Sequence, residues 1–435
     1  MNSINQSIEK TTVKKIMLRI LPFIFICYVV AYLDRINLGF AALEMNADLA
    51  ISAEVFGLLS GIFFIGYIIF EIPSNMIMQK VGAKFWIARI MITWGIISLF
   101  TAFVQSATHL YIVRFLLGVA EAGFFPGIVL YLTYWFRSKE RARASAAFML
   151  AMPVCAIIGA PLSVWIMDNI NWAGIAGWRW MFILEGLPAI ILGIITIFYL
   201  ENRPKNAKWL TEEERNWIEN ELEVERTESR TVNKTSKLAM FKDSKIWKLS
   251  FIYFAVYCAN YALAFWLPSI IKSLSGGLSN TDIGWLSIIP SLIGIPSMLI
   301  WAWSSDKHNE HRNHLIVACL LVTFGFTLSG FVEGAGLTIL LISIAAIGLN
   351  GFIGVFFSYV TMAFTESTAP VGIATVNTLG SLGGFVGPAL LGVLSFTNGM
   401  YLIAFLILLA SVLLLTFKQR IATNNHTVEL QQNSI

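Results

Sequence analysis

The sequence predicts an all-α membrane protein with twelve transmembrane helices in two pseudo-symmetric bundles of six. Of its 435 residues, 57% are hydrophobic and only 13% are charged, and the mean hydropathy is +0.72, far above that of soluble globular proteins. Apolar stretches of about 20 residues, the length that a helix needs to cross a bilayer, also recur along the chain with short polar breaks between them. A polytopic membrane protein follows from these two observations.

Each apolar stretch predicts one membrane-spanning helix. The twelve expected spans are 18–43, 54–77, 85–105, 109–136, 143–167, 179–200, 247–271, 283–304, 314–332, 337–364, 370–396 and 399–417.

The positions of the basic residues predict the orientation. With the N-terminus inside, nearly all of the 30 Lys and Arg residues fall in cytoplasmic segments; the exceptions are Arg35, Arg114, Arg179 and Lys272. By the positive-inside rule, we therefore expect a multi-pass protein of the inner (plasma) membrane with both termini in the cytoplasm. This bias also accounts for the net charge of +4, so that charge is no argument for a nucleic-acid partner.

One long polar stretch divides the spans into two sets of six. We expect an N-terminal bundle at 1–200, a cytoplasmic linker at 201–246 and a C-terminal bundle at 247–435. Within the linker, WLTEEERNWIENELEVE predicts an amphipathic helix that lies on the inner membrane surface or caps the two halves.

Internal repetition favours a duplicated origin of the halves. Gln79-Lys80 follows the second span and Asp306-Lys307 follows the eighth, while Pro161 and Pro388 lie in the fifth and eleventh; both pairs are 227 positions apart. Transporter halves are commonly built from such repeats.

Four charged residues lie deep in the first half, where each costs about 2.5–3.5 kcal/mol unless a partner or water stabilises it. At 1.5 Å per residue, Asp34 is about 13 Å below the outer end of its span, next to Arg35. Arg114 and Glu121 are about 8 and 18 Å below the outer end of theirs, two helical turns apart on one face. A shared cluster is therefore possible. The same span contains Gly118, Ala122 and Gly127, small residues that either permit close approach of a neighbouring helix or leave room for a ligand.

Two interpretations of this cluster remain open. The four groups could form structural salt bridges between the first and fourth spans, although buried ion pairs stabilise proteins poorly compared with apolar packing. Alternatively, protonation of Asp34 or Glu121 releases an arginine, which then holds a substrate carboxylate through paired hydrogen bonds. The second interpretation predicts coupled binding of a proton and an anion.

Other polar groups allow weaker predictions. Tyr257, Asn260, Tyr261 and Trp266 in the seventh span either line a cavity or anchor the helix at the interface. Asn350 in the tenth span is a similar case.

Two further acids lie nearer to span ends. Glu71, at the cytoplasmic end of its span, favours a gating or helix-end role, and Glu185 is expected to pair structurally with Arg179.

Several classes of protein and site are disfavoured. The GxxxxGK[ST] motif of an ATP-driven pump is absent, no catalytic constellation suggests an enzyme, and the four cysteines fall within spans without metal-ligand spacing. The sequence thus predicts no metal and no cofactor. The remaining rival is a proton-coupled exporter of drugs or metabolites.

Four motifs carry a family resemblance: YLDRINLGFA, EIPSNMIMQKVGAKFWIAR, RFLLGVAEAGFFPG and GWRWMFILEGLPA. Together they resemble the anion:cation symporter family of the major facilitator superfamily, above all its bacterial organic-acid permeases for tartrate, 4-hydroxyphenylacetate and related carboxylates. The likeness covers nearly the whole chain and is more specific in the first half.

The resemblance implies roles for individual residues. Asp34 and Glu121 would take part in proton coupling, and Arg35 and Arg114 would bind the substrate carboxylate. Further substrate contacts would come from Tyr32, Tyr67 and Asn377, with Tyr261 added from the aromatic seventh span.

The family's cytoplasmic loop pattern is kept only in part. Lys80, Gly82 and Lys84 match it, and Asp306 keeps the acid of the second copy, but Gln79 replaces the usual acid of the first copy. We therefore expect Glu71, Lys80, Gly82 and Asp306 to act in gating.

The sequence thus predicts a monomeric, proton-coupled symporter that imports a small organic anion by alternating access. Its substrate class would be a hydroxy, aromatic or sugar carboxylate.

Overall fold

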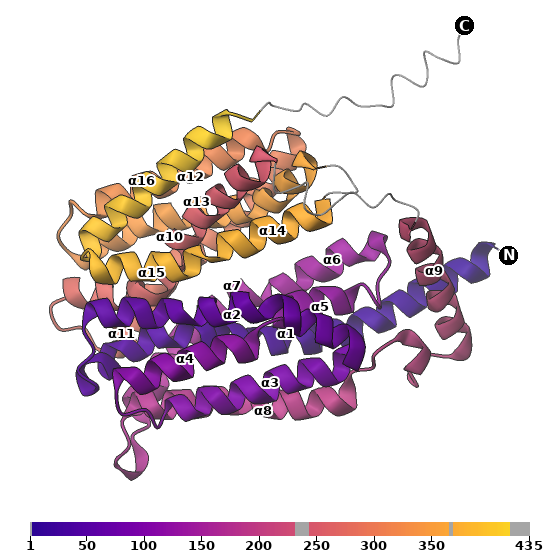
Figure 1. The fold of residues 1–435 in the computed structure, drawn as a ribbon, viewed down its shortest axis with the longest axis horizontal. Helices are drawn as coiled ribbons and strands as arrows, with labels where there is room; N and C mark the ends of the chain where they lie inside the picture. Colours follow the sequence, from indigo (N-terminus) through magenta and orange to yellow (C-terminus); the bar gives the residue numbers. More distant parts are fainter. Residues whose placement is uncertain (1, 231–242, 365–368, 418–435) are drawn as a thin grey trace, which may run out of the picture.

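The computed structural model describes residues 2–230, 243–364 and 369–417, and it confirms the all-helical prediction (Figure 1). Twelve helical segments are long and apolar enough to cross a membrane, and each overlaps one expected span. Three of these spans contain a break, so each consists of two consecutive helices.

The first group of helices covers the first six spans. It contains α1 (Asn2–Asp48), α2 (Ala53–Val81), α3 (Ala83–Thr101), α4 (Ala107–Glu121), α5 (Phe124–Leu132), α6 (Ser138–Met149), α7 (Ala151–Asn169) and α8 (Gly177–Tyr199). Short 3₁₀ turns at Trp172–Gly174 and Pro204–Asn206 precede and follow α8.

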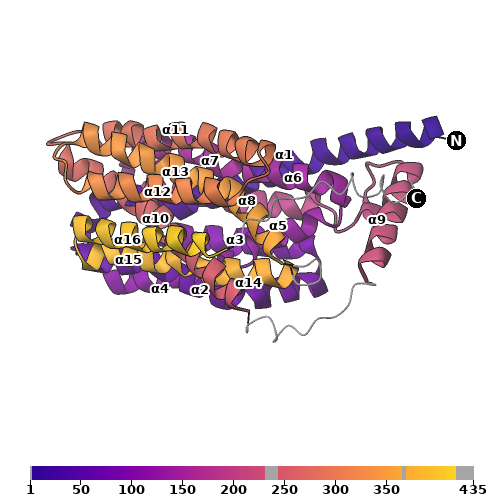
Figure 2. The same cartoon turned by 90° about the horizontal axis from the view of Figure 1, so that it is seen from above.

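The second group lies beside the first (Figures 1 and 2). It contains α10 (Ser244–Leu274), α11 (Asn280–Lys307), α12 (Arg312–Ser329), α13 (Ala335–Ala363), α14 (Ala369–Ser381), α15 (Gly383–Val393) and α16 (Phe396–Leu415).

Small residues bring α2 and α4 into close contact. A Cβ on Gly118 would collide with the carbonyl oxygen of Phe63, so only glycine allows this approach. Just after Glu121, Gly123 adopts the left-handed conformation (φ 87°) and ends the α4 direction. The expected role of Gly118 in close helix packing is therefore confirmed. The break between α4 and α5 was not predicted from the sequence.

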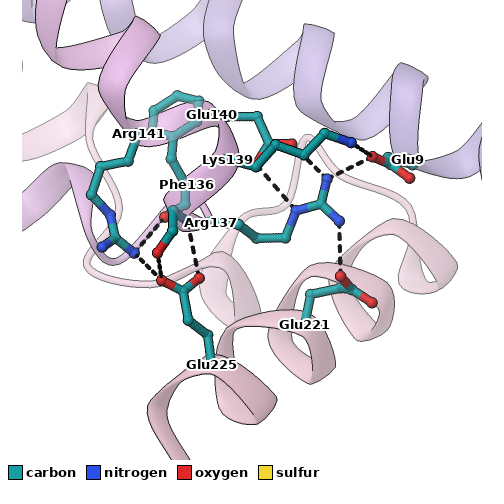
Figure 3. Close-up of polar contacts among 9 residues, drawn as sticks. Glu9, Phe136, Arg137, Lys139, Glu140, Arg141, Glu221 and Glu225 are labelled. Carbon is teal, nitrogen blue, oxygen red and sulfur yellow. Dashed lines mark hydrogen bonds and ion pairs between the residues drawn. The ribbon is translucent and has the colours of Figure 1, made fainter. Parts of the chain in front are cut away.

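The helix α9 (Glu212–Arg230) follows the first group and crosses its end. Figure 3 shows Arg137, before α6, donating to Glu9 of α1 and Glu221 of α9, at 2.7 and 2.8 Å. Arg141 pairs with Glu225 at 2.9 Å. These contacts fasten the predicted amphipathic helix to the first group. We call this the α9 end of the molecule.

The two groups are joined at the end opposite α9. Asp168 of α7 accepts hydrogen bonds from the backbone N–H of Thr281 and the side-chain amide of Asn280, both at 2.9 Å. Lys272 of α10 donates to the carbonyl oxygen of Leu43 at 2.6 Å. Within the described ranges, no hydrogen bond or ion pair joins the groups at the α9 end, so polar closure is confined to one side.

Glycines also join the groups, without polar contacts. Gly57 and Gly61 of α2 face the backbone of α15 so closely that a Cβ on either residue would meet a carbonyl oxygen within 2.7 Å. Gly39 of α1 approaches the backbone of α10 in the same way. Such contacts allow two helix surfaces to lie close together while leaving few side chains to disengage when they part.

Candidate functional site

An ion pair between α1 and α4 forms the centre of the charged site. The Nη2 atom of Arg35 lies 2.6 Å from the Oε2 atom of Glu121. The Glu121 side chain is only 1% exposed, whereas that of Arg35 is 13% exposed. Solvent therefore reaches the cation of this pair more readily than the acid.

The second arginine is buried without a partner. Arg114 is 0% exposed, and none of its three guanidinium nitrogens has a hydrogen-bond partner in the part of the chain that the structure describes. Its guanidinium carbon lies 5.3 Å from the ring centre of Phe63, and that of Arg35 lies 5.1 Å from the same ring. An aromatic ring thus stabilises both cations through its electron-rich face.

Asp34 faces the serine of a third helix. The hydroxyl of Ser98, on α3, donates to Oδ1 of Asp34, while Oδ2 has no partner among the described residues. Asp34 is 1% exposed. Neither Ser98 nor Phe63 was predicted from the sequence as part of the site. Ser98 could have been identified, because a polar residue in an apolar span usually faces the protein interior.

Burial brings all four expected charges into one region without pairing them all. Only Arg35 and Glu121 form an ion pair; Asp34 and Arg114 keep unsatisfied polar atoms. An unsatisfied buried group costs about 1–3 kcal/mol, more if charged, so this arrangement does not serve stability alone. The open donors of Arg114 and the free oxygens of the acids are instead suited to bind an anion and protons.

Two tyrosines of the first group, Tyr32 and Tyr67, were expected to contact the substrate. The ring centre of Tyr67 is 5.4 Å from the guanidinium carbon of Arg35. Tyr32 lines a cavity of about 140 Å³ between the groups, together with Asn260 of α10 and Asn350 of α13. The cavity-lining interpretation of both asparagines is thereby favoured over surface anchoring.

Of the two expected residues of the second group, Tyr261 lies at the interface with the first group. The ring of Tyr261 contacts that of Phe64 across the interface, with centroids 4.5 Å apart. Asn377 is half-buried on α14, and its backbone carbonyl accepts a hydrogen bond from Ser381. No contact recorded for the described residues joins Asn377 to either arginine.

The four expected gating residues occupy different surroundings. Glu71 is buried, and its Oε2 atom has no partner among the residues described. Lys80 and Asp306 are exposed. Gly82 has φ 100° and turns the chain between α2 and α3, against Asn202, whose Oδ1 accepts a hydrogen bond from the backbone of Lys84.

The expected pairing of Glu185 with Arg179 is wrong. Glu185 accepts hydrogen bonds from the Asn37 amide (2.9 Å) and the Ser163 hydroxyl (2.7 Å), and is 2% exposed. Arg179 instead donates to the carbonyl oxygens of Ala102 and Val104. The difference arises because Glu185 points into the bundle from the buried face of α8, whereas Arg179 lies near its first turn, among loop carbonyls.

A family model described as Major Facilitator Superfamily matches residues 24–277 and 250–432 of this chain. A protein of Agrobacterium vitis is 44% identical over 95% of this chain and 92% of its own; its name assigns it tartrate transport provisionally. The quinolone resistance transporter of Acinetobacter baumannii is 36% identical over 93% of this chain and 94% of its own.

Two solved structures share the fold at low sequence identity. A bacterial homologue of the human lysosomal transporter Spinster, in an inward-facing and occupied conformation, aligns with a TM-score of 0.75 at 16% identity, over 91% of this chain and 95% of that one. The xylose transporter XylE of E. coli, in a partially occluded inward-open conformation, aligns with a TM-score of 0.72 at 12% identity, over 94% and 100%.

Proposed function

Because the chain belongs to the major facilitator superfamily and is therefore a multi-pass membrane transporter of a small molecule, we propose that it imports a small organic anion together with protons. The proposed substrate class is a hydroxy, aromatic or sugar carboxylate. We further propose that residues 1–200 and 247–435 are the two moving halves, joined by the linker 201–246, and that the protein acts as a monomer.

The buried, unpartnered guanidinium of Arg114 is the observation that carries this proposal. A buried guanidinium with unused donors favours an anionic ligand, because the oxygens of the ligand supply the missing hydrogen-bond acceptors in a medium of low dielectric. The nearby Arg35 adds a second guanidinium, whose side chain is 13% exposed. The relative of Agrobacterium vitis at 44% identity, whose name refers to tartrate transport, supports a carboxylate as that anion.

Proton coupling follows from the charge balance of the site. With both acids ionised, Asp34 and Glu121 balance the two arginines, and Glu121 occupies the Arg35 fork. A proton on Glu121 removes its negative charge and frees the Arg35 donors for the paired oxygens of a substrate carboxylate. Protonation alone leaves the cluster with a net positive charge, and binding of the anion restores neutrality. The proton and the anion therefore bind together.

Alternating access follows from the one-sided closure. The distribution of Lys and Arg residues favours a cytoplasmic α9 end in a bacterial inner membrane. The polar contacts of Asp168 and Lys272 then close the outer side, which supports an inward-facing state. Rocking of the halves about the central site would break these contacts and expose Arg35 to the outside.

Export is the second candidate, because a relative named as a quinolone resistance transporter covers almost the whole chain. The two directions predict opposite responses of cells. An importer lets cells accumulate the anion, whereas an exporter lowers the cellular content of its substrate and raises resistance.

Uptake into proteoliposomes tests the proposal. Labelled tartrate should accumulate only with a proton gradient directed into the vesicle lumen, and an ionophore that collapses the gradient should abolish accumulation. A panel of hydroxy, aromatic and sugar carboxylates, assayed by competition, would identify the preferred member. If the uptake rates of all transported anions were the same with and without the proton gradient, symport would be ruled out.

A further inference from the structure

A second cavity lies far from the charged cluster, at the α9 end of the second group. Its volume is about 350 Å³, within the roughly 300–1,000 Å³ of typical ligand sites. The ends of four helices surround it: the start of α10, the turn before α12, and the ends of α13 and α16. It is larger than the cavity between the groups.

Cationic side chains outnumber acids in this cavity. Lys245 and Lys248 come from the first turns of α10, and Arg312 opens α12. Among the described residues, Glu310 is the one carboxylate that lines the cavity, and both of its oxygens are engaged, by the backbone N–H of Asn313 and by His314. The net excess of positive charge favours an anion.

Several donors in the cavity are unused. Lys245 is exposed, and neither its ammonium nor the hydroxyl of Tyr359 is hydrogen-bonded to another described residue. The buried Nε atom of Arg312 also has no partner among the described residues. Arg312 is held in place by its Nη1 atom, which donates to the carbonyl oxygen of Phe417 at 2.9 Å. Lys248 makes one hydrogen bond, to Thr416, and has two further N–H donors.

The cavity lies at the level of a membrane–water interface. Trp247, 54% exposed, directly precedes Lys248 on α10, and exposed tryptophans of spanning helices concentrate at that level. Apolar surface comes from Met362 and from the rings of Tyr359 and Phe417, whose centroids are 6.0 Å apart. A cationic site beside apolar surface is suited to the headgroup of an anionic phospholipid and also to a soluble phosphate ester.

We propose that this cavity is a binding site for a phosphate group, formed by Lys245, Lys248 and Arg312. An anionic phospholipid of the leaflet on the α9 side and a soluble phosphate monoester share this chemistry. Basic pockets between helices at the cytoplasmic side of a membrane bind such headgroups. The site lies outside the transport pathway proposed above and does not depend on the substrate.

Thermal stability of the purified full-length protein, in neutral detergent, tests the site. Phosphatidylglycerol in mixed micelles should raise the apparent Tm, because it binds the folded state, and phosphatidylcholine should not. The double variant Lys245→Gln/Lys248→Gln should need roughly 25-fold more phosphatidylglycerol for the same shift, since each lysine near an anionic surface contributes about 1 kcal/mol. Glycerol 3-phosphate forms a second arm.

The matched control is Lys205→Gln/Lys208→Gln, which removes two exposed lysines at the same end of the first group. The control should respond to phosphatidylglycerol as the wild type does. A shift by glycerol 3-phosphate that the cavity variant loses would support the site with a soluble ester as its ligand. Equal responses of the wild type, the cavity variant and the control to both ligands would overturn the proposal.

A third variant separates charge from geometry. Arg312→Lys keeps the charge but loses the planar fork, so the phosphatidylglycerol response should weaken by less than in the double lysine variant. A response unchanged in Arg312→Lys and lost in the double variant would restrict the site to α10; a response unchanged in both would contradict it.

Discussion

The two groups of helices share a layout and differ in chemistry. Every buried charged side chain among the described residues lies before residue 231, including Arg114 and Glu121. The second group instead carries a ladder of tyrosines on α10: Tyr253, Tyr257 and Tyr261 follow one another every four residues, with ring centroids 4.5 and 5.3 Å apart. One group is suited to charge and protons, the other to the apolar body of a substrate.

This asymmetry shows what a duplicated fold leaves free to change. Close helix packing depends on small residues, and both groups keep it: Gly118 lies against α2 in the first, and Gly348 against α12 in the second. Buried charges are costly, so one set of them is enough if the proposed proton coupling takes place in the first group alone.

Removing the unpartnered cation should have the largest effect. Arg114→Ala leaves Asp34 and Glu121 without one of their two counter-charges, and breaking a buried charge set costs about 3–5 kcal/mol. Carboxylate binding, measured by calorimetry, should weaken by at least about 100-fold. The control Arg89→Ala removes a half-buried arginine of α3 in the same group and should bind normally. Normal binding by Arg114→Ala would exclude this residue from the substrate site.

Neutralising the acid of the ion pair should separate binding from energy coupling. Glu121→Gln mimics the protonated acid, so the variant should exchange substrate across proteoliposomes yet lose accumulation against a gradient. The matched control is Glu185→Gln, since Glu185 is equally buried and has no cationic partner among the described residues. Retained accumulation by Glu121→Gln, or its equal loss in both variants, would remove the specific coupling role of Glu121.

A change on the aromatic side should alter affinity alone. Tyr261→Phe keeps the ring that packs on Phe64 and removes only the hydroxyl. We expect this hydroxyl to donate a hydrogen bond to the substrate, and such a bond contributes about 1 kcal/mol, so KM should rise by about fivefold while the ratio of protons to substrate stays constant. Simultaneous pH-jump and substrate-uptake measurements give that ratio. A changed ratio would show that the second group also takes part in coupling.

The smallest effect should occur outside the membrane, at the attachment of α9. Burial raises the pKa of Glu214, but hydrogen bonds from Lys15 (2.7 Å) and Thr211 outweigh it and hold the pKa below its usual 4.5. A lowered folded-state pKa contributes stability above the unfolded value that is lost as the pH falls through the folded one. Protection of α9 from hydrogen exchange should therefore decrease in acid below about pH 4.5.

Glu214→Gln provides the control for this pH dependence. The variant keeps the helix but lacks the titrating group, so its protection should vary less with pH than that of the wild type. An identical acid response in the two proteins would assign the effect to other groups, such as the acids around Arg137 in Figure 3.

Local pattern was enough to predict the number and positions of the spans. Hydrophobic length is a property of consecutive residues, and a helix satisfies its own backbone within lipid, so each apolar stretch specifies one crossing. The break after Glu121 was missed because it depends on Gly123, which faces Ser74 of another helix. The positions of Asp34, Arg35, Arg114 and Glu121 at related depths were likewise predictable from helix rise alone.

Composition and helix rise within single segments were enough to predict the membrane class, the twelve spans and the related depths of the four charges. The partners of those charges depend on the tertiary structure. It paired Arg35 with Glu121, left Arg114 beside Phe63, and gave Glu185 to Asn37 and Ser163 instead of Arg179. The rotation of each helix about its axis selects such partners, and packing against neighbours far along the chain sets that rotation.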